Sequence, residues 1–223
     1  MPPEALRKIA SPPAPAERAT AAPRRRSRKH GAIIAAAKAV FFEDGYAGAS
    51  MDRITARAGV SKATIYANFR SKEEVLRAVV DEVVAPISTQ YESAISRIED
   101  FHEWLLKLGQ HMTRNALLPD VVALERLVVG EALRFPELGA LYTRSAVAPA
   151  LKLFQPRFEA AIAAGILRQT DSHVALLRFA EWCTGSMRRE VVMNQRPCPD
   201  DAEIDAFVAD AVEAFLHGYE ARD

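Results

Sequence analysis

The segment at residues 50–69 constrains the fold of this chain more than any other part of its sequence. Ser50 and Ser61 are natural N-caps, because a serine hydroxyl can accept a hydrogen bond from an amide of the first helical turn. Gly59 allows a tight turn between the two helices that these caps begin. The expected helices are 51–58 and 62–69. Two short helices joined in this way predict a helix-turn-helix.

The second helix keeps large side chains off its outer face. Ile65 and Phe69 are four residues apart and are expected to face inward. The positions expected to face outward are Ser61, Lys62, Ala63, Thr64, Ala67 and Asn68. A helix with so little bulk can enter the major groove of DNA, which is about 12 Å wide. An ordinary helical hairpin is the alternative interpretation.

Charge is distributed unevenly along the chain, although the formal net charge is +0. Residues 1–80 contain 15 Lys and Arg against 7 Asp and Glu, and residues 81–223 contain 14 against 22. A basic head on an acidic body is typical of a protein that holds DNA with one end only. Chance clustering of solvated faces would give the same counts.

Three stretches resemble the tetracycline-repressor (TetR) family. GVSKATIYANFRSKEEV, residues 59–75, closely resembles its recognition-helix signature, and FFEDGYAGASMDRITARA, residues 41–58, fits its first two helices. LERLVVGEALRFPELGALY, residues 124–142, resembles the C-terminal domain of AefR-like members. The resemblance implies a dimeric, all-helical repressor that releases double-stranded DNA when a small molecule binds its C-terminal domain.

The resemblance also implies roles for individual residues. Lys62, Ala63 and Thr64 occupy positions that approach base edges, while Ser50, Tyr66, Asn68 and Lys72 occupy positions that reach phosphates. The expected DNA-binding set is Ser50, Ser61, Lys62, Ala63, Thr64, Tyr66, Asn68 and Lys72. Ala63 stands where glycine is frequent. Asn68 stands where an aromatic residue or His is frequent, which puts that phosphate contact in doubt.

The N-terminal part divides into a tail and a basic run. Residues 1–23 are rich in Ala and Pro and are expected to be disordered. The run RRRSRKH follows at residues 24–30, directly before the first helix, which is expected at residues 27–44. This run is either a solvated tail or an arm that contacts DNA. The arm would add Arg24, Arg25 and Arg26 to the DNA-binding set.

The whole chain is predicted to be all-α, with a three-helix DNA-binding domain at 24–75 and a helical ligand-binding and dimerisation domain at 76–223. The expected body helices are 72–92, 97–117, 120–134, 143–164, 171–194 and 201–219. The last two carry apolar stripes, which we expect to form a homodimer interface across a two-fold axis. The interface residues would be Leu176, Ala180, Cys183, Met187, Phe207, Ala211 and Phe215. Burial within one monomer is the alternative.

A small-molecule pocket is expected between the body helices. The candidate lining residues are Trp104, Leu108, His111, Met112, Phe154, Phe158 and Trp182. Trp104 and Trp182 are favoured because a large ring with one N–H donor suits a mostly apolar cavity. Each of these apolar side chains could equally belong to the core.

The sequence shows no pattern typical of an enzyme. His102 and His111 lie nine residues apart, on opposite sides of a helix, and no zinc-protease or glycine-rich phosphate motif occurs. We therefore expect no catalytic residues, no metal and no cofactor. The sequence contains no run of about 18 apolar residues, so no membrane-spanning helix is predicted. Only two cysteines, Cys183 and Cys198, occur, so a bacterial cytoplasmic location is expected.

Three functions are therefore distinguished. The first is a dimeric repressor that a small molecule releases from a pseudo-palindromic operator. The second is a DNA-binding regulator without such an inducer, controlled by a protein partner or by its own abundance. The third is a helical enzyme or interaction module with a basic head, for which the sequence supplies no nucleophile, base or metal set.

Overall fold

The computed structural model describes the backbone of residues 22–95 and 97–221, and the side chains of 28–84, 95 and 97–221. The described chain is helical, and its only extended pairing is an isolated bridge between Leu167 and Glu220. The elements are α1 (Ala22–Gly48), α2 (Met51–Ala58), α3 (Lys62–Asn68), α4 (Lys72–Ile95), α5 (Phe101–Ala116), α6 (Pro119–Glu131), α7 (Pro136–Tyr142), the π-helical turn η1 (Thr143–Val147), α8 (Ala148–Ala163), α9 (Ser172–Val192) and α10 (Asp201–Tyr219). The all-α prediction is confirmed.

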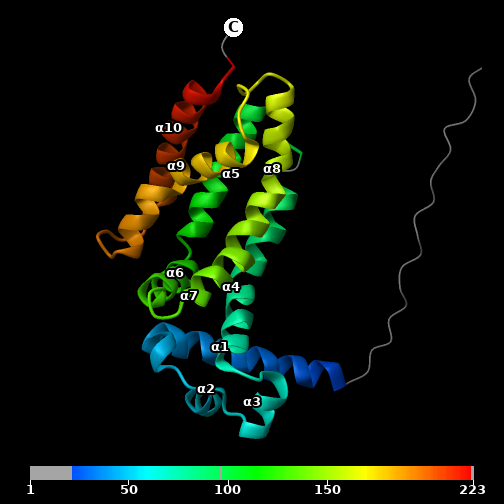
Figure 1. Ribbon diagram of the computed structural model, residues 1–223, viewed down its shortest axis with the longest axis vertical. Helices are drawn as coiled ribbons and strands as arrows, with labels where there is room; N and C mark the ends of the chain where they lie inside the picture. Colours follow the sequence, from blue (N-terminus) through cyan, green and yellow to red (C-terminus); the bar gives the residue numbers. More distant parts are fainter. Residues whose placement is uncertain (1–21, 96, 222–223) are drawn as a thin grey trace, which may run out of the picture.

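The first three helices form a head at one end of the molecule, and α4 leads from it into a bundle of the later helices (Figure 1). The expected domain boundary after residue 75 lies inside α4. Within the described residues, no helix is both long enough and apolar enough to cross a membrane.

Helix α1 begins earlier than the sequence predicted. Its backbone is helical from Ala22, so the basic run at residues 24–30 continues the helix and does not form a separate extended arm. The side chains of Arg24, Arg25 and Arg26 lie outside the described set, as do residues 1–21 of the tail that was expected at 1–23. Gly45, with φ 72°, interrupts the helix where its end was predicted.

The predicted N-caps are present at the start of both helices of the helix-turn-helix. The Ser50 hydroxyl accepts a hydrogen bond from the Arg53 amide at 3.2 Å, and that of Ser61 accepts one from the Thr64 amide at 3.2 Å. Gly59 takes the left-handed conformation, with φ 62° and ψ 31°. This turn sets the direction of α3 relative to α2.

One hydrophobic core joins the head to part of the body. Ile54 and Ile65 are fully buried, as the inward faces of α2 and α3 predicted. The same cluster contains four side chains of α6: Val121, Leu124, Leu127 and Val128. Helix α6 therefore packs directly against the head formed by the first three helices.

A second core fills the body, and it corrects the expected dimer interface. Leu176, Cys183, Met187, Ala211 and Phe215 are all buried in this core within a single monomer. Ala180 and Phe207 are only partly buried. The stripes on α9 and α10 face each other and α5, so the prediction was wrong about which face of these helices is free.

Gly109 makes the close approach of α5 possible. A Cβ at this position would lie 2.7 Å from Val208 Cγ1 and 2.9 Å from Cys183 Sγ. A side chain there would push α5 away from both α9 and α10. The face of α5 that carries Gly109 thus packs against the apolar stripes of α9 and α10.

Candidate nucleic-acid interface and ligand cavity

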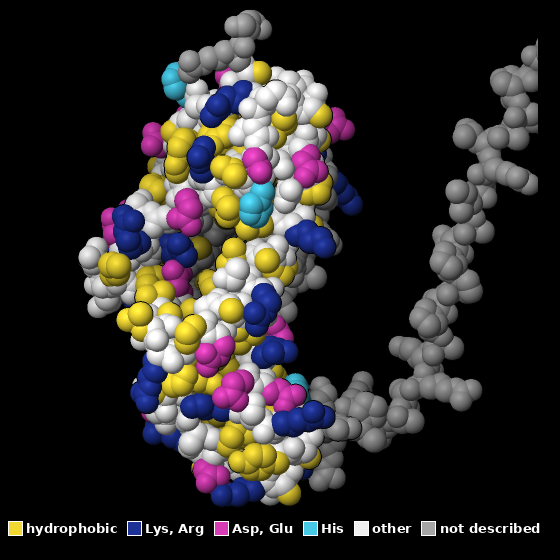
Figure 2. All heavy atoms as spheres, in the orientation of Figure 1, with side chains coloured by type: hydrophobic (Ala, Val, Ile, Leu, Met, Phe, Trp, Pro, Cys, Tyr) yellow, Lys and Arg dark blue, Asp and Glu magenta, His cyan; other side chains and the backbone are white. Residues whose placement is uncertain are grey.

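The outer face of α3 is open, and Tyr66 is the one large side chain that α3 exposes there. Tyr66 is 52% exposed, and Lys62, Ala63 and Ala67 are also exposed. Ile65 and Phe69 anchor the opposite face, with exposures of 0% and 3%. Figure 2 shows Lys and Arg side chains on the head, interspersed with Asp and Glu. Apart from Tyr66, the exposed side chains of this helix are small or flexible, as entry into a major groove requires.

Lys62 begins this face and is already paired with an acid. Its Nζ lies 2.8 Å from Asp52 Oδ1, and both side chains are largely exposed. The hydrogen bond to Asp52, and then its negative charge, raise the pKa of Lys62, so the amine is positively charged at neutral pH. An exposed pair like this is weak, so DNA can replace Asp52 as the partner.

Thr64 and Asn68 are less free than the sequence suggested. The hydroxyls of Ser61 and Thr64 lie 2.9 Å apart. Asn68 Nδ2 donates to the Thr64 carbonyl at 2.8 Å, which turns its amide back onto its own helix. The doubt about Asn68 as a phosphate contact therefore has a structural basis.

Lys72 holds the turn between α1 and α2. Its Nζ donates to the carbonyls of Tyr46 at 2.7 Å and Ala49 at 3.2 Å, and it lies 4.3 Å from the centroid of the Tyr46 ring. The Tyr46 hydroxyl donates in turn to Glu73 at 2.8 Å. Because an ammonium has three donors, only one remains for a phosphate.

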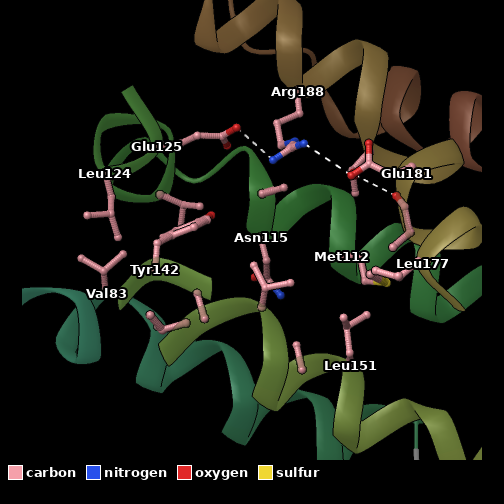
Figure 3. Close-up of a pocket in the computed structure, with 18 residues that line it drawn as sticks. Val83, Met112, Asn115, Leu124, Glu125, Tyr142, Leu151, Leu177, Glu181 and Arg188 are labelled. Carbon is pink, nitrogen blue, oxygen red and sulfur yellow. Dashed lines mark hydrogen bonds and ion pairs between the residues drawn. The ribbon is translucent and has the colours of Figure 1, made fainter. Parts of the chain in front are cut away.

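A cavity of about 200 Å³ lies in the body. It is bounded by helices α4, α5, α6, α7, α8 and α9 and by the π-helical turn η1 (Figure 3). Its walls are mostly apolar, and small side chains such as Ala146, Val147 and Ala150 leave the space open. The volume far exceeds the roughly 10–15 Å³ that a single water needs, so the cavity can hold a small organic molecule.

The structure brings only one of the predicted ligand residues, Met112, to this cavity. Trp104, Leu108, Phe154 and Phe158 belong to the body core, where Phe158 lies within 6.0 Å of several other rings. Trp182 is 42% exposed on the outside of α9, and His111 is not among the lining residues. Large aromatic side chains fill space, so choosing them located the core and missed the cavity.

The polar part of the cavity wall centres on Arg188. Its Nη1 donates to Glu125 Oε1 at 2.9 Å, and its Nη2 lies 3.7 Å from Glu181 Oε1. Burial, and then the charge of nearby Glu125, raise the pKa of Tyr142, so its phenol stays protonated. Asn115 and Thr184 complete the polar lining. The sequence analysis did not single out these residues, because they lie on four separate helices.

Helix α6 connects the cavity to the head. Its side chains Val121 and Leu124 line the cavity and also belong to the core of the head. At its start Asp120 pairs with Lys38 of α1 at 2.6 Å, and at its end Glu131 accepts a hydrogen bond from the Ala47 amide at 2.8 Å. Helix α6 therefore contacts α1 at both of its ends and lines the cavity between them.

Among the described side chains, no group of three or more His, Cys, Asp or Glu residues is placed to hold a metal ion.

Two family models match the chain. Residues 33–79 match that of bacterial regulatory proteins of the tetR family, and residues 103–221 match the C-terminal domain of AefR-like transcriptional repressors. The HTH-type transcriptional activator FasR of Mycolicibacterium smegmatis is 37% identical over 75 residues. That alignment spans 34% of this chain and 34% of FasR, so it covers only part of each protein.

Solved structures resemble the chain over nearly its whole length. A TetR-family transcriptional regulator from Mesorhizobium loti has a TM-score of 0.76 and 26% identity, covering 88% of this chain and 99% of that one. The flavonoid-responsive regulator FrrA has a TM-score of 0.72 and 26% identity, covering 88% and 100%. Both the head and the body thus have counterparts in regulators of known structure.

Proposed function

Because this chain belongs to the TetR family of bacterial regulatory proteins and has an AefR-like C-terminal domain, we propose that it is a dimeric repressor released from DNA by a small molecule. The chain is a DNA-binding transcriptional regulator. Its action as a repressor, its dimeric state and its release by a small molecule are what we propose beyond this. The observation that carries this proposal is the position of α6, which lines the cavity and packs on the head.

In the proposed mechanism the ligand selects one of two states of the molecule. The unliganded dimer holds its two α3 helices about 34–36 Å apart, which matches half-sites separated by one turn of DNA. A ligand that moves α6 shifts α1 through the Lys38–Asp120 and Ala47–Glu131 contacts. The heads then no longer fit both half-sites at once.

The dimer is proposed to form through the outward face of α9 and α10. Trp182 and Ala214 are exposed there, on the side opposite the buried stripes. A Cβ at Gly218 would lie 3.9 Å from the Trp182 ring, so the two helices are close together on this face. Pairing such a face with its copy gives a four-helix arrangement.

The named relatives differ in sign, since FasR is an activator and the matched C-terminal family consists of repressors. FrrA is named for its response to flavonoids, which supports control by a small molecule. The cavity also favours this function over a regulator controlled only by a partner or by abundance.

The direct test is binding to the DNA upstream of the protein's own gene, measured by fluorescence anisotropy at two salt concentrations. We expect specific binding that weakens as salt rises, because contacts to phosphates release counterions. Absence of specific binding at any protein concentration would reject the proposed function.

The Thr64→Ala variant tests the face of α3. It should change which bases are preferred, whereas Thr143→Ala, an exposed substitution in η1, should leave both affinity and preference unchanged. If Thr64→Ala keeps the original preference, Thr64 does not read bases.

A further inference from the structure

Three buried polar atoms at the cavity have no hydrogen-bond partner among the side chains that the structure describes: Asn115 Nδ2, Glu125 Oε2 and Arg188 Nε. Asn115 is 8% exposed, and the Glu125 side chain is 14% exposed. Their side chains come from α5, α6 and α9 and surround the same space (Figure 3). Buried polar groups are nearly always paired in folded proteins. These two donors, Asn115 Nδ2 and Arg188 Nε, and the acceptor Glu125 Oε2 therefore indicate a ligand that pairs with them.

The charges at this wall disfavour an anion. Two carboxylates, Glu125 and Glu181, face the single guanidinium of Arg188. The closer one, Glu125, is already hydrogen-bonded to Arg188, so a ligand carboxylate would have to displace it. That exchange would leave the buried Glu125 carboxylate without its cation, which is costly.

A cation fits no better. An ammonium could donate to Glu125 Oε2, but it has no acceptor for Asn115 Nδ2 or Arg188 Nε. It would also lie beside the positive guanidinium. The remaining wall is apolar, with Val83, Leu124 and Leu151 among its members.

We propose that this cavity binds an uncharged, largely apolar small molecule that carries a hydroxyl group and an acceptor oxygen. The hydroxyl donates to Glu125 Oε2, and the acceptor oxygen receives a hydrogen bond from Asn115 Nδ2 or Arg188 Nε. The inference rests on the proposed function only in treating this cavity as the regulatory site. The specific step beyond it is the polarity of the ligand.

Matched probes on one apolar body test this polarity. We would measure the Kd of the full chain for 2-naphthol, naphthalene-2-carboxylate and naphthalene-2-methylammonium by calorimetry at pH 7. The first is uncharged at this pH because its phenol resembles that of tyrosine, and the others carry one negative and one positive charge. We expect 2-naphthol to bind at least about tenfold more tightly than either, as one charge-assisted hydrogen bond gained or lost would give.

Two substitutions of Glu test the reason for the preference. Glu125→Gln removes the buried charge and frees Arg188, so the carboxylate probe should gain about tenfold in affinity and the preference for 2-naphthol should vanish. Glu181→Gln is the matched control, because the Glu181 side chain is 67% exposed and water screens its charge. Glu181→Gln should change the ratio of the Kd for the carboxylate probe to the Kd for 2-naphthol by less than about threefold.

A third variant keeps the test decisive if Glu125→Gln does not fold. Asn115→Leu replaces the amide with an apolar group of the same branching. The single oxygen of 2-naphthol both donates to Glu125 Oε2 and accepts from the neighbouring donors, so losing Asn115 Nδ2 should weaken the binding of 2-naphthol more than that of naphthalene. A melting curve and DNA binding check that each variant is folded.

The possible outcomes separate the two proposals. Tighter binding of the carboxylate or the ammonium, or no binding of 2-naphthol up to its solubility limit, would overturn the inferred ligand polarity even if DNA binding is specific. A preference for 2-naphthol that follows the Glu125 variant supports the inference, even if the protein fails to bind its upstream DNA. That second failure would reject only the proposed function.

Discussion

Gly59 is the residue on which the turn between α2 and α3 depends. Its φ of 62° is a conformation that costs a non-glycine residue roughly 1–2 kcal/mol. A Cβ there would contact nothing within 4 Å, so the backbone alone determines the cost. Gly59→Ala should therefore lower the free energy of unfolding by about 1 kcal/mol, measured by urea denaturation.

Gly31 supplies the opposite control for the same substitution. It lies within α1, and a Cβ there also contacts nothing within 4 Å. Gly31→Ala should raise the free energy of unfolding by about 0.5–1 kcal/mol, because alanine favours the helix. Equal effects of the two substitutions would contradict this account of the turn.

A substitution of Lys72 tests whether this residue positions the start of α2 or contacts a phosphate of DNA. Lys72→Met removes the donor shared by the Tyr46 and Ala49 carbonyls, so the free energy of unfolding should fall by roughly 1–2 kcal/mol. Affinity for all DNA sequences should also fall, because the start of α2 is no longer held. If Lys72 acts by positioning, the slope of log K against log salt stays the same.

The salt slope is the measurement that decides between the two roles. If Lys72 binds a phosphate, its loss should make the slope of log K against log salt shallower by about 0.9. That result would support the phosphate contact that the family resemblance implies. Lys107→Met, on an exposed part of α5, is the matched control and should change neither stability nor binding.

At the residue scale, sequence predicted best what is local. The Ser50 and Ser61 caps and the Gly59 turn depend on neighbours within a few positions, and all three are confirmed. The partners of Lys72 lie 26 and 23 residues away, so no pattern along the chain could reveal them. The same holds for the cavity, whose polar residues come from separate helices.

At the scale of elements, α6 should behave as part of the head. Glu131→Ala removes the acceptor of the Ala47 amide, so hydrogen exchange at Ala47 should accelerate by at least about tenfold, as loss of a hydrogen bond of about 1.4 kcal/mol implies. The measurement is amide exchange by NMR. Glu137→Ala, an exposed residue on α7, is the control and should leave this amide unchanged. Unchanged exchange in Glu131→Ala would mean that α6 does not hold the end of α1.

The elements themselves were predicted unevenly. The last helix was expected at 201–219 and is found there, because its apolar stripe is long and regular. Helix α7 was missed, because it has only seven residues and lies between the helices expected at 120–134 and 143–164. This missed helix brings Tyr142 to the cavity. Periodicity identified the buried faces of α9 and α10 but could not say which neighbour covers them.

At the scale of the whole molecule, DNA binding should depend on the outward face of α9 and α10. Trp182 is 42% exposed and packs edge-on against Phe215, with ring centroids 6.0 Å apart. Trp182→Glu would place a charge in an apolar dimer contact, so the protein should sediment as a monomer. A monomer binds one half-site at a time and loses the second, linked binding event, so operator affinity should fall by roughly 10²–10⁴-fold.

A substitution elsewhere on the surface shows whether this loss is specific to the dimer. Leu133 is 102% exposed beyond the end of α6, away from α9 and α10 in sequence, so Leu133→Glu should remain dimeric and keep its operator affinity. Analytical ultracentrifugation and anisotropy on the same samples make the comparison, and melting curves confirm folding. If Trp182→Glu stays dimeric with unchanged affinity, the two heads are joined through another surface.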